Sequence, residues 1–177
     1  MRILIAGGGI GGLTTALALH AAGLDVEVVE ATAQLRPLGV GINVLPHAVG
    51  VLSGLGLADE MAQLAIPTRE VAFYNRHGQR IWQDGRGLDA GYPFPQYSVH
   101  RGEMHLMLYR IACARLGADR VITGQRLERF DQHRNPCVRA AVAPSSKTFQ
   151  HDGSELRPRP PPRCPPPPGV ALRGLWV

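Results

Sequence analysis

The order of apolar and polar residues from Arg2 to Glu30 predicts a strand, a helix and a second strand. Arg2–Ala6 is a short apolar run of the kind found in buried parallel strands, and Val26–Glu30 is another. Between them, apolar residues recur at helical spacing from Leu13 to Ala22, and Gly23 marks the helix end. The segment Gly7–Gly12 is predicted to be a turn. This order of elements predicts a right-handed crossover and a parallel sheet.

The pattern continues to about residue 131 with further helices and short strands. A β-hairpin is predicted where two strand-like segments flank the turn Arg76–Gly78. Two glycine-containing stretches, Leu35–Asn43 and Gly85–Gln96, are predicted to be loops. The fold class is therefore α/β, a Rossmann-like domain with an inserted hairpin. The other predicted elements are helices at Pro46–Leu55 and Gly102–Leu116, and strands at Glu70–Asn75, Gln79–Gln83, Arg120–Ile122 and Gln125–Phe130.

Charge and proline content divide the 177 residues into two regions. Residues 1–131 hold 12 arginines and 12 acidic residues, so the net charge of +5 falls entirely within residues 132–177. Eight prolines lie within Pro158–Pro168, and proline cannot join the interior of a helix or sheet. We therefore expect a partial domain over residues 1–131 and a disordered, low-complexity Pro/Arg-rich tail over 132–177. Because the basic charge is confined to that tail, no nucleic-acid-binding surface is expected.

The cysteines and the N-terminal apolar run narrow the class of protein further. Cys113, Cys137 and Cys164 are odd in number and have no CxxC spacing, which argues against a disulfide framework or a zinc site. None of the seven histidines forms a pair with metal-ligand spacing, so no metal is expected. Glycines from Gly7 onward interrupt the N-terminal run too early for a signal peptide, and no apolar stretch is long enough to predict a membrane span. A cytoplasmic protein is expected.

A glycine motif lies between the first strand and the first helix. In Gly7-x-Gly9-x-x-Gly12, the first glycine permits a tight turn, the second lets the backbone approach a pyrophosphate, and the third lets the helix pack on the strand. Glu30 ends the second strand at the distance from Gly12 where a carboxylate accepts hydrogen bonds from ribose hydroxyls. Since a carboxylate there repels a 2′-phosphate, the motif predicts NAD or FAD as the ligand.

Three further segments follow in order, and they carry a family resemblance. They are Arg36-Pro37-Leu38-Gly39-Val40-Gly41-Ile42-Asn43, Ala65-Ile66-Pro67-Thr68 and Gln96-Tyr97-Ser98-Val99-His100-Arg101-Gly102-Glu103. With the glycine motif, they make residues 1–131 resemble the class A FAD-dependent aromatic monooxygenases of the para-hydroxybenzoate and salicylate hydroxylase type. The resemblance is strongest to the phenazine-modifying branch, typified by 5-methylphenazine-1-carboxylate 1-monooxygenase. It implies that the dinucleotide is FAD.

The resemblance also implies FAD contacts at matching positions along the chain. Arg101 would bind FAD from the start of its helix, near the phosphates or the ribityl chain, although a solvated surface arginine is the alternative. No catalytic side chain is implied. The other implied contacts are Gly7, Gly9, Ile10, Gly11, Gly12 and Leu13 at the pyrophosphate, Glu30, Ala31 and the Leu127 backbone at the adenosine, and Gly39, Val40 and Gly41 beside the flavin.

In the resembled enzymes, NADPH or NADH reduces FAD, and O₂ supplies an oxygen atom to an aromatic small-molecule substrate, while the protein positions the reactants and excludes water. The family pattern stops near residue 132. A second FAD motif would place Asp-Gly after an apolar strand, but Asp152-Gly153 follows the polar segment Thr148–His151. Our hypothesis is that the tail is a frameshift product, in which case the truncated chain is expected to lack hydroxylase activity.

Two other function classes remain open from the sequence. One is a different FAD- or NAD-dependent oxidoreductase that shares only the strand–helix–strand arrangement ending at Glu30. The segments 36–43 and 96–103 argue against it. The other is a non-catalytic interaction protein that presents Pro158–Pro168 to an aromatic-lined groove on a partner.

Overall fold

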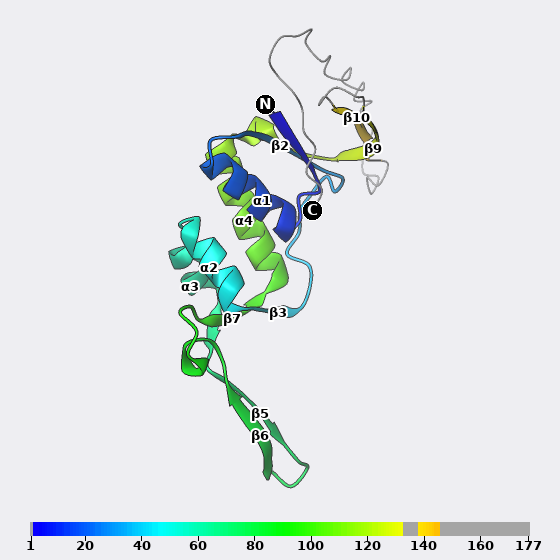
Figure 1. The fold of residues 1–177 in the computed structure, drawn as a ribbon. Coiled ribbons are helices and arrows are strands. Elements are labelled where there is room, and N and C mark those ends of the chain that lie inside the picture. Colours follow the sequence, from blue (N-terminus) through cyan, green and yellow to red (C-terminus); the bar gives the residue numbers. More distant parts are fainter. Residues whose placement is uncertain (1, 133–137, 146–177) are drawn as a thin grey trace. The chain divides into compact units, whose positions relative to one another are not determined.

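The predicted strand–helix–strand arrangement opens the structure, a computed structural model that describes residues 2–132 and 138–145. Strands β1 (Arg2–Ala6) and β2 (Asp25–Glu30) are parallel neighbours, joined through helix α1 (Ile10–Ala21) (Figure 1). Strand β8 (Val121–Thr123) pairs in parallel with the other edge of β2, which gives the order β1-β2-β8. The predicted α/β class with a parallel sheet is confirmed.

Helix α1 begins three residues earlier than the apolar pattern predicts. Gly9 is the N-cap in extended conformation, with φ −74° and ψ 179°, and its carbonyl accepts the Leu13 N–H at 2.9 Å. Gly11 and Gly12 therefore lie in the first turn of the helix and not in the predicted loop turn before it. The low helix propensity of glycine does not prevent this. The predicted end is confirmed: Gly23 has φ +77°, which favours glycine, and donates its N–H to the His20 carbonyl.

The core beside this sheet consists of buried valines of β2 and one face of α1. Val26, Val28 and Val29 of β2 are each at most 4% exposed, and α1 packs on β2 with its own buried side chains. Those side chains are Leu13, Ala16 and Leu17, which share one face of α1 and are at most 1% exposed.

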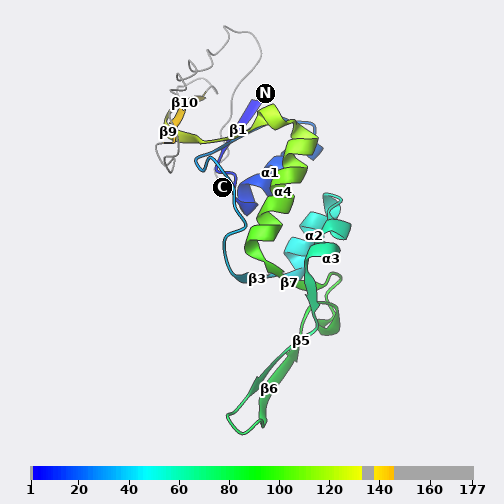
Figure 2. The same cartoon turned by 180° about the vertical axis from the view of Figure 1, so that it is seen from behind.

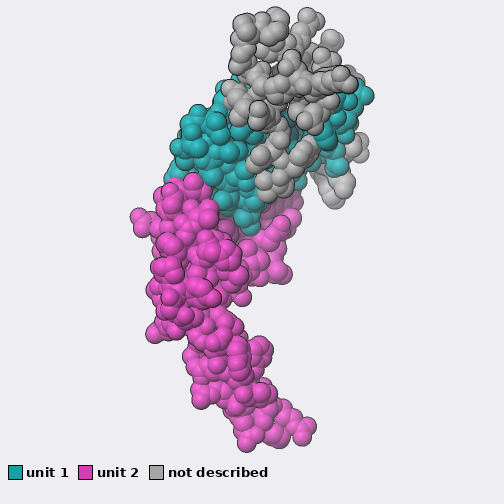
Figure 3. Space-filling model, viewed as in Figure 1, with its two compact units in different colours: residues 1–35, 108–177 teal, residues 36–107 magenta. Residues whose placement is uncertain are grey.

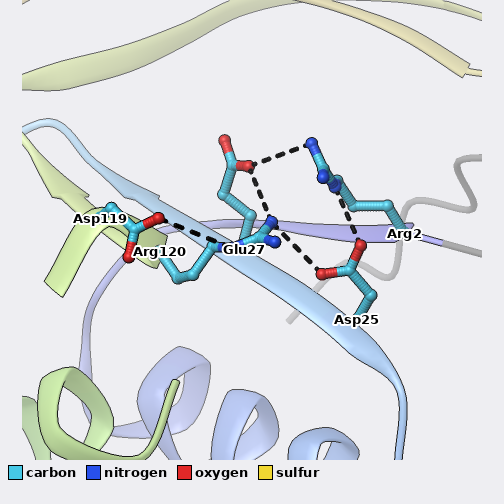
Figure 4. A network of polar contacts seen from close by, with 5 residues as sticks. All are labelled: Arg2, Asp25, Glu27, Asp119 and Arg120. Atoms are coloured by element: carbon cyan, nitrogen blue, oxygen red, sulfur yellow. Dashed lines mark hydrogen bonds and ion pairs between the residues drawn. The ribbon is translucent and has the colours of Figure 1, made fainter. Parts of the chain in front are cut away.

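A network of ion pairs lies where β1 and β2 begin and just before β8 (Figure 4). The Arg2 guanidinium contacts Asp25 at 3.1 Å and Glu27 at 3.8 Å. Arg120 contacts the same two carboxylates, at 3.2 Å and 3.8 Å, and also Asp119 at 4.0 Å. Two arginines therefore share two acidic side chains of β2, and all of these groups keep part of their surface in water.

The chain divides into two compact units, residues 1–35 with 108–177, and residues 36–107 (Figure 3). The second unit contains an antiparallel sheet with the order β3-β7-β4, formed by β3 (Gly41–Val44), β7 (Gln96–His100) and β4 (Ile66–Thr68). Gly41 pairs with His100 in this sheet. These three strands were not predicted, because each is short and depends on partners far away in the sequence.

Helices α2 (Pro46–Gly54) and α3 (Ala58–Leu64) belong to the same unit. Helix α2 confirms the prediction for Pro46–Leu55 and buries Val49 and Leu52. Helix α3 was not predicted from its short sequence, although it buries Met61 completely. The Phe94 ring packs closely against Gly50 of α2, because a Cβ on Gly50 would lie 2.8 Å from that ring.

The predicted hairpin is formed by β5 (Glu70–Tyr74) and β6 (Arg80–Gly85), and Figure 2 shows the two strands side by side. In its turn, the Asn75 side-chain oxygen accepts the backbone N–H groups of His77 and Gln79 at 2.9 and 3.0 Å. Gly78 has φ +78°. Phe73 and Trp82 are cross-strand partners with ring centroids 5.7 Å apart, which stabilises the register. A short 3-10 helix, η1 (Gly87–Ala90), lies in the predicted loop after β6.

The last described elements are helix α4 (Arg101–Leu116), the 3-10 helix η2 (Ala118–Arg120) and the antiparallel pair of β9 (Gln125–Gln132) and β10 (Val138–Pro144). Helix α4 and β9 confirm their predictions, with slightly different ends. The prediction of no element after residue 132 is wrong for β10. The sequence of β10 gives no strand signal of its own, and the strand forms because pairing with β9 supplies its backbone hydrogen bonds. The proline-rich run lies outside the described residues.

Candidate dinucleotide-binding site

The turn between β1 and α1 is held by backbone geometry that requires glycine. Gly7 has φ +110° and donates its N–H to the Val29 carbonyl of β2 at 2.7 Å. A Cβ on Gly12 would overlap the Gly7 carbonyl oxygen and lie 3.4 Å from the Ile5 side chain. Gly7 therefore permits the turn, and Gly12 permits the helix to pack against β1, as the motif predicts.

Gly9 differs from these two glycines because no contact within the protein requires a glycine at this position. A Cβ on Gly9 would meet nothing within 4 Å, its conformation suits any residue, and the position is exposed. The N-cap makes no side-chain hydrogen bond, and the first turn of α1 holds no acidic residue. The first-turn N–H groups, including those of Ile10 and Gly11, have no carbonyl partner within the helix and carry the positive end of its dipole. This arrangement fits a phosphate group approaching an open glycine.

Leu13 contributes differently from the glycines before it. Its side chain is completely buried, and its N–H donates to the Gly9 carbonyl. The geometry therefore gives Leu13 a packing function beneath the turn.

The Glu30 carboxylate lies against the glycine turn. One of its oxygens, Oε2, accepts the Gly8 N–H at 2.7 Å, and the other, Oε1, accepts the Thr32 N–H at 2.6 Å. Ala31, between Glu30 and Thr32, is half-buried. The sequence predicts cofactor contacts at Glu30 and Ala31 but assigns no individual role to Gly8 or Thr32. The three consecutive glycines at 7–9 were the available indication for Gly8, whereas nothing in the pattern distinguished Thr32.

In the other unit, the loop before β3 lies against the start of α4. A Cβ on Gly39, which has φ +136°, would lie 3.4 Å from the Arg101 Cβ and 3.7 Å from its Nη1. The Arg101 N–H donates to the Val40 carbonyl at 3.1 Å. Gly102 packs on the same loop, because a Cβ there would lie 2.6 Å from the Pro37 Cα. The structure thus brings together two segments that are far apart in the sequence.

The loop presents its side chains outward. Val40 is 73% exposed and Leu38 is 71% exposed, although both are apolar. Arg101 is also exposed, and Gly41 begins β3 in register with His100. An exposed guanidinium beside a glycine-lined backbone is suited to a phosphate or another anionic group.

Leu127, in β9, is half-buried and pairs with Val142 of β10. The segment before β9 contacts the end of β2, because Gly124 donates its N–H to the Thr32 carbonyl at 3.2 Å. Leu127 thus lies shortly after a segment that is bonded to the Glu30–Thr32 region.

Within the described ranges, no group of three or more histidine, cysteine or acidic side chains could hold a metal ion. No described helix combines the length and apolar character needed to cross a membrane. The chemistry that the glycine turn and its carboxylate support is the binding of a dinucleotide.

The parallel sheet, the glycine turn and the carboxylate at the end of β2 define a dinucleotide-binding α/β domain. A family model described as the FAD binding domain matches residues 1–145, and the chain belongs to this family. This match extends through β10 and confirms FAD rather than NAD as the dinucleotide. It also argues against the alternatives of an NAD-linked enzyme and an interaction protein.

Comparison with curated proteins confirms the resemblance to FAD-dependent aromatic monooxygenases. The chain is 51% identical over 133 residues to the phenazine 1,6-dicarboxylic acid hydroxylase PhzS of Lysobacter antibioticus, an alignment that covers 75% of this chain and 33% of that protein. It is also 33% identical over 117 residues to the 3-amino-4-hydroxybenzoate 2-monooxygenase of Streptomyces cremeus, covering 61% of this chain and 28% of the relative. The chain thus spans a third or less of the length of these relatives.

Solved structures agree with this assignment. The structure of Klebsiella pneumoniae HpxO in complex with FAD and uric acid aligns with a TM-score of 0.66 and 27% identity, covering 81% of this chain and 37% of that one.

Proposed function

We propose that this chain is the FAD-binding part of a flavin-dependent monooxygenase that hydroxylates an aromatic small-molecule substrate, with NADPH or NADH as the reductant and O₂ as the oxygen source. The observation that carries the proposal is the geometry of the open Gly9 turn with Glu30 bonded against it, within a chain 51% identical to a phenazine hydroxylase over 133 residues. A phenazine-type aromatic acid is the substrate class that this relative favours.

The proposed FAD contacts are those that the family resemblance implies, and the geometry within each unit supports some of them. The backbone of Gly7, Gly9, Ile10, Gly11 and Gly12 would bind the pyrophosphate, with Leu13 supporting the turn from below. Glu30, Ala31 and the backbone near Leu127 would bind the adenosine. Gly39, Val40 and Gly41 would lie along the flavin, and Arg101 would bind FAD through its guanidinium.

When bound, FAD supplies the redox and oxygen-transfer chemistry. The residues of this chain then bind and orient it, through backbone amides, one carboxylate and one guanidinium, and no side chain of the described residues is assigned a catalytic function. A cytoplasmic location is part of the proposal, and it is supported by the odd number of cysteines without CxxC spacing.

The test is FAD titration of the purified chain, followed by flavin fluorescence and absorbance. We expect saturable binding that weakens about tenfold in Arg101→Gln, because one charge-assisted contact to an anion is lost. Arg110→Gln is the matched control, since Arg110 is exposed on the same helix. Equal affinity in the two variants would exclude Arg101 from the site, and no binding by the unmodified chain would contradict the proposal itself.

A second measurement addresses the reaction. NADPH and NADH oxidation and oxygen uptake are followed with and without a phenazine carboxylic acid. Since the matched region corresponds to about a third of the hydroxylase relative, we expect FAD binding by this chain without substrate-stimulated oxygen uptake. Stimulated uptake would contradict the expected inactivity.

A further inference from the structure

Glu30 makes two hydrogen bonds to the backbone of its own chain. Its carboxylate oxygens accept the N–H groups of Gly8, at 2.7 Å, and of Thr32, at 2.6 Å. Bonds from an N–H to a carboxylate are about twice as strong as those between neutral groups. These contacts differ from the ribose contact of the proposed function, because they lie entirely within the protein.

The contact with Gly8 includes the stem of the side chain as well as its charge. A Cβ on Gly8 would lie 3.0 Å from the Glu30 Cβ and 3.3 Å from its Cγ, so the two residues are in direct contact. The neighbouring Gly7 N–H bonds to the Val29 carbonyl at 2.7 Å. Two successive residues of the turn are therefore held by two successive residues at the end of β2.

The contact with Thr32 extends this connection to a third segment. The Thr32 carbonyl accepts the Gly124 N–H at 3.2 Å, and Gly124, with φ +73°, lies between β8 and β9. Glu30 thus links the glycine turn, the segment after β2 and the β8–β9 connection.

We propose that Glu30 is a positioning residue for the glycine turn, in addition to its ribose contact, and this inference rests on the proposed function. Three consecutive glycines have more conformational freedom than any other tripeptide, and ordering them on binding would cost affinity. By holding Gly8 against β2, the carboxylate keeps the turn and the start of α1 in the conformation that receives a phosphate.

The test separates positioning from ribose contact by removing the ribose hydroxyls from the ligand. Affinities for ADP and for 2′,3′-dideoxy-ADP are measured by calorimetry with the unmodified chain, Glu30→Gln and the control Glu128→Gln, which changes an exposed glutamate of β9. Glutamine has nearly the same shape as glutamate, but offers one acceptor oxygen and no charge. We expect Glu30→Gln to weaken dideoxy-ADP binding at least about fivefold, although this ligand has no ribose hydroxyl to contact. Unchanged dideoxy-ADP affinity would overturn the proposal.

Amide hydrogen exchange of the nucleotide-free protein provides a readout that does not depend on ligand binding. We expect the Gly8 and Thr32 amides to exchange faster in Glu30→Gln, while the core amides of Ile5 and Val28 are unchanged. If the core amides also become fast, the variant has unfolded, and Glu30→Asp, which keeps the charge on a shorter side chain, takes its place. Unchanged exchange at both Gly8 and Thr32 overturns the inference. Failure of the unmodified chain to bind either nucleotide contradicts the proposed function instead, while the exchange data still decide the positioning.

Discussion

Replacing Gly12 by alanine should destabilise the protein, whereas the same change at Gly9 should mainly weaken ligand binding. The two glycines belong to one turn, but their surroundings differ. The new Cβ at residue 12 would be closer than 3.0 Å to the Gly7 carbonyl oxygen, and at residue 9 it would meet nothing within 4 Å.

The magnitude for Gly12→Ala follows from the displacement that the methyl group forces. The first turn of α1 must move by roughly 1 Å from β1 to restore van der Waals separation. Overpacking of this kind costs about 1–3 kcal/mol, and the backbone oxygen cannot rotate away as a side chain would. The better helix propensity of alanine recovers less than about 1 kcal/mol, since the position is in the first turn. We therefore expect a loss of about 2 kcal/mol in the free energy of unfolding.

Urea denaturation and thermal unfolding measure this loss. A loss of about 2 kcal/mol corresponds to a Tm lower by roughly 4–8 °C for a chain of this size. Gly9→Ala should lose less than about 1 kcal/mol, the cost of a poorer N-cap, but bind FAD at least about tenfold more weakly. If Gly12→Ala unfolds like the unmodified chain, the packing argument is wrong. If Gly9→Ala keeps its full FAD affinity, the close approach of a phosphate to Gly9 is refuted.

Two further predictions concern charged and titratable side chains. Arg120→Gln should lower the free energy of unfolding by about 0.5–1 kcal/mol, because it removes the contacts with Asp25 and Glu27. In urea denaturation, about 0.5 M NaCl should reduce the difference in stability between the variant and the unmodified protein. A larger loss that does not depend on salt would show that packing, not charge, is responsible. The pKa of Tyr109 is raised above its ordinary value near 10, first by burial and then by the hydrogen bond and the charge of Cys113. The fold thus favours the neutral phenol, and this contribution is present below pH about 10 and is lost as the pH rises through the raised pKa. Between roughly pH 9 and pH 11, the Tm of Tyr109→Phe should therefore decrease less steeply than the Tm of the unmodified protein. Parallel Tm curves for the two proteins would refute the assignment.

The segment from Arg2 to Glu30 could be interpreted from the sequence because its structure depends on local features. An apolar strand, a helical face and glycines at fixed offsets determine β1, α1 and β2, and Gly23 ends the helix through its own backbone. Glu30 could be predicted to be a ligand group for the same reason, since its distance from Gly12 along a strand and helix is nearly constant. The hairpin β5–β6 was also predictable, because its turn residues carry their own hydrogen bonds.

Other features depend on contacts between distant segments, and the sequence pattern did not contain them. The short strands β3, β4 and β7 exist through their mutual pairing, and β10 exists through β9, since a strand obtains its hydrogen bonds from a neighbour. The resemblance suggested that Gly39 and Arg101 both bind FAD, but only the fold shows Arg101 packed against Gly39. The sequence alone thus determined the presence of a glycine turn with a carboxylate after it. Only the tertiary structure decided that this carboxylate holds Gly8 and Thr32, because the hydrogen bond from Gly8 depends on how β2 lies beside the turn.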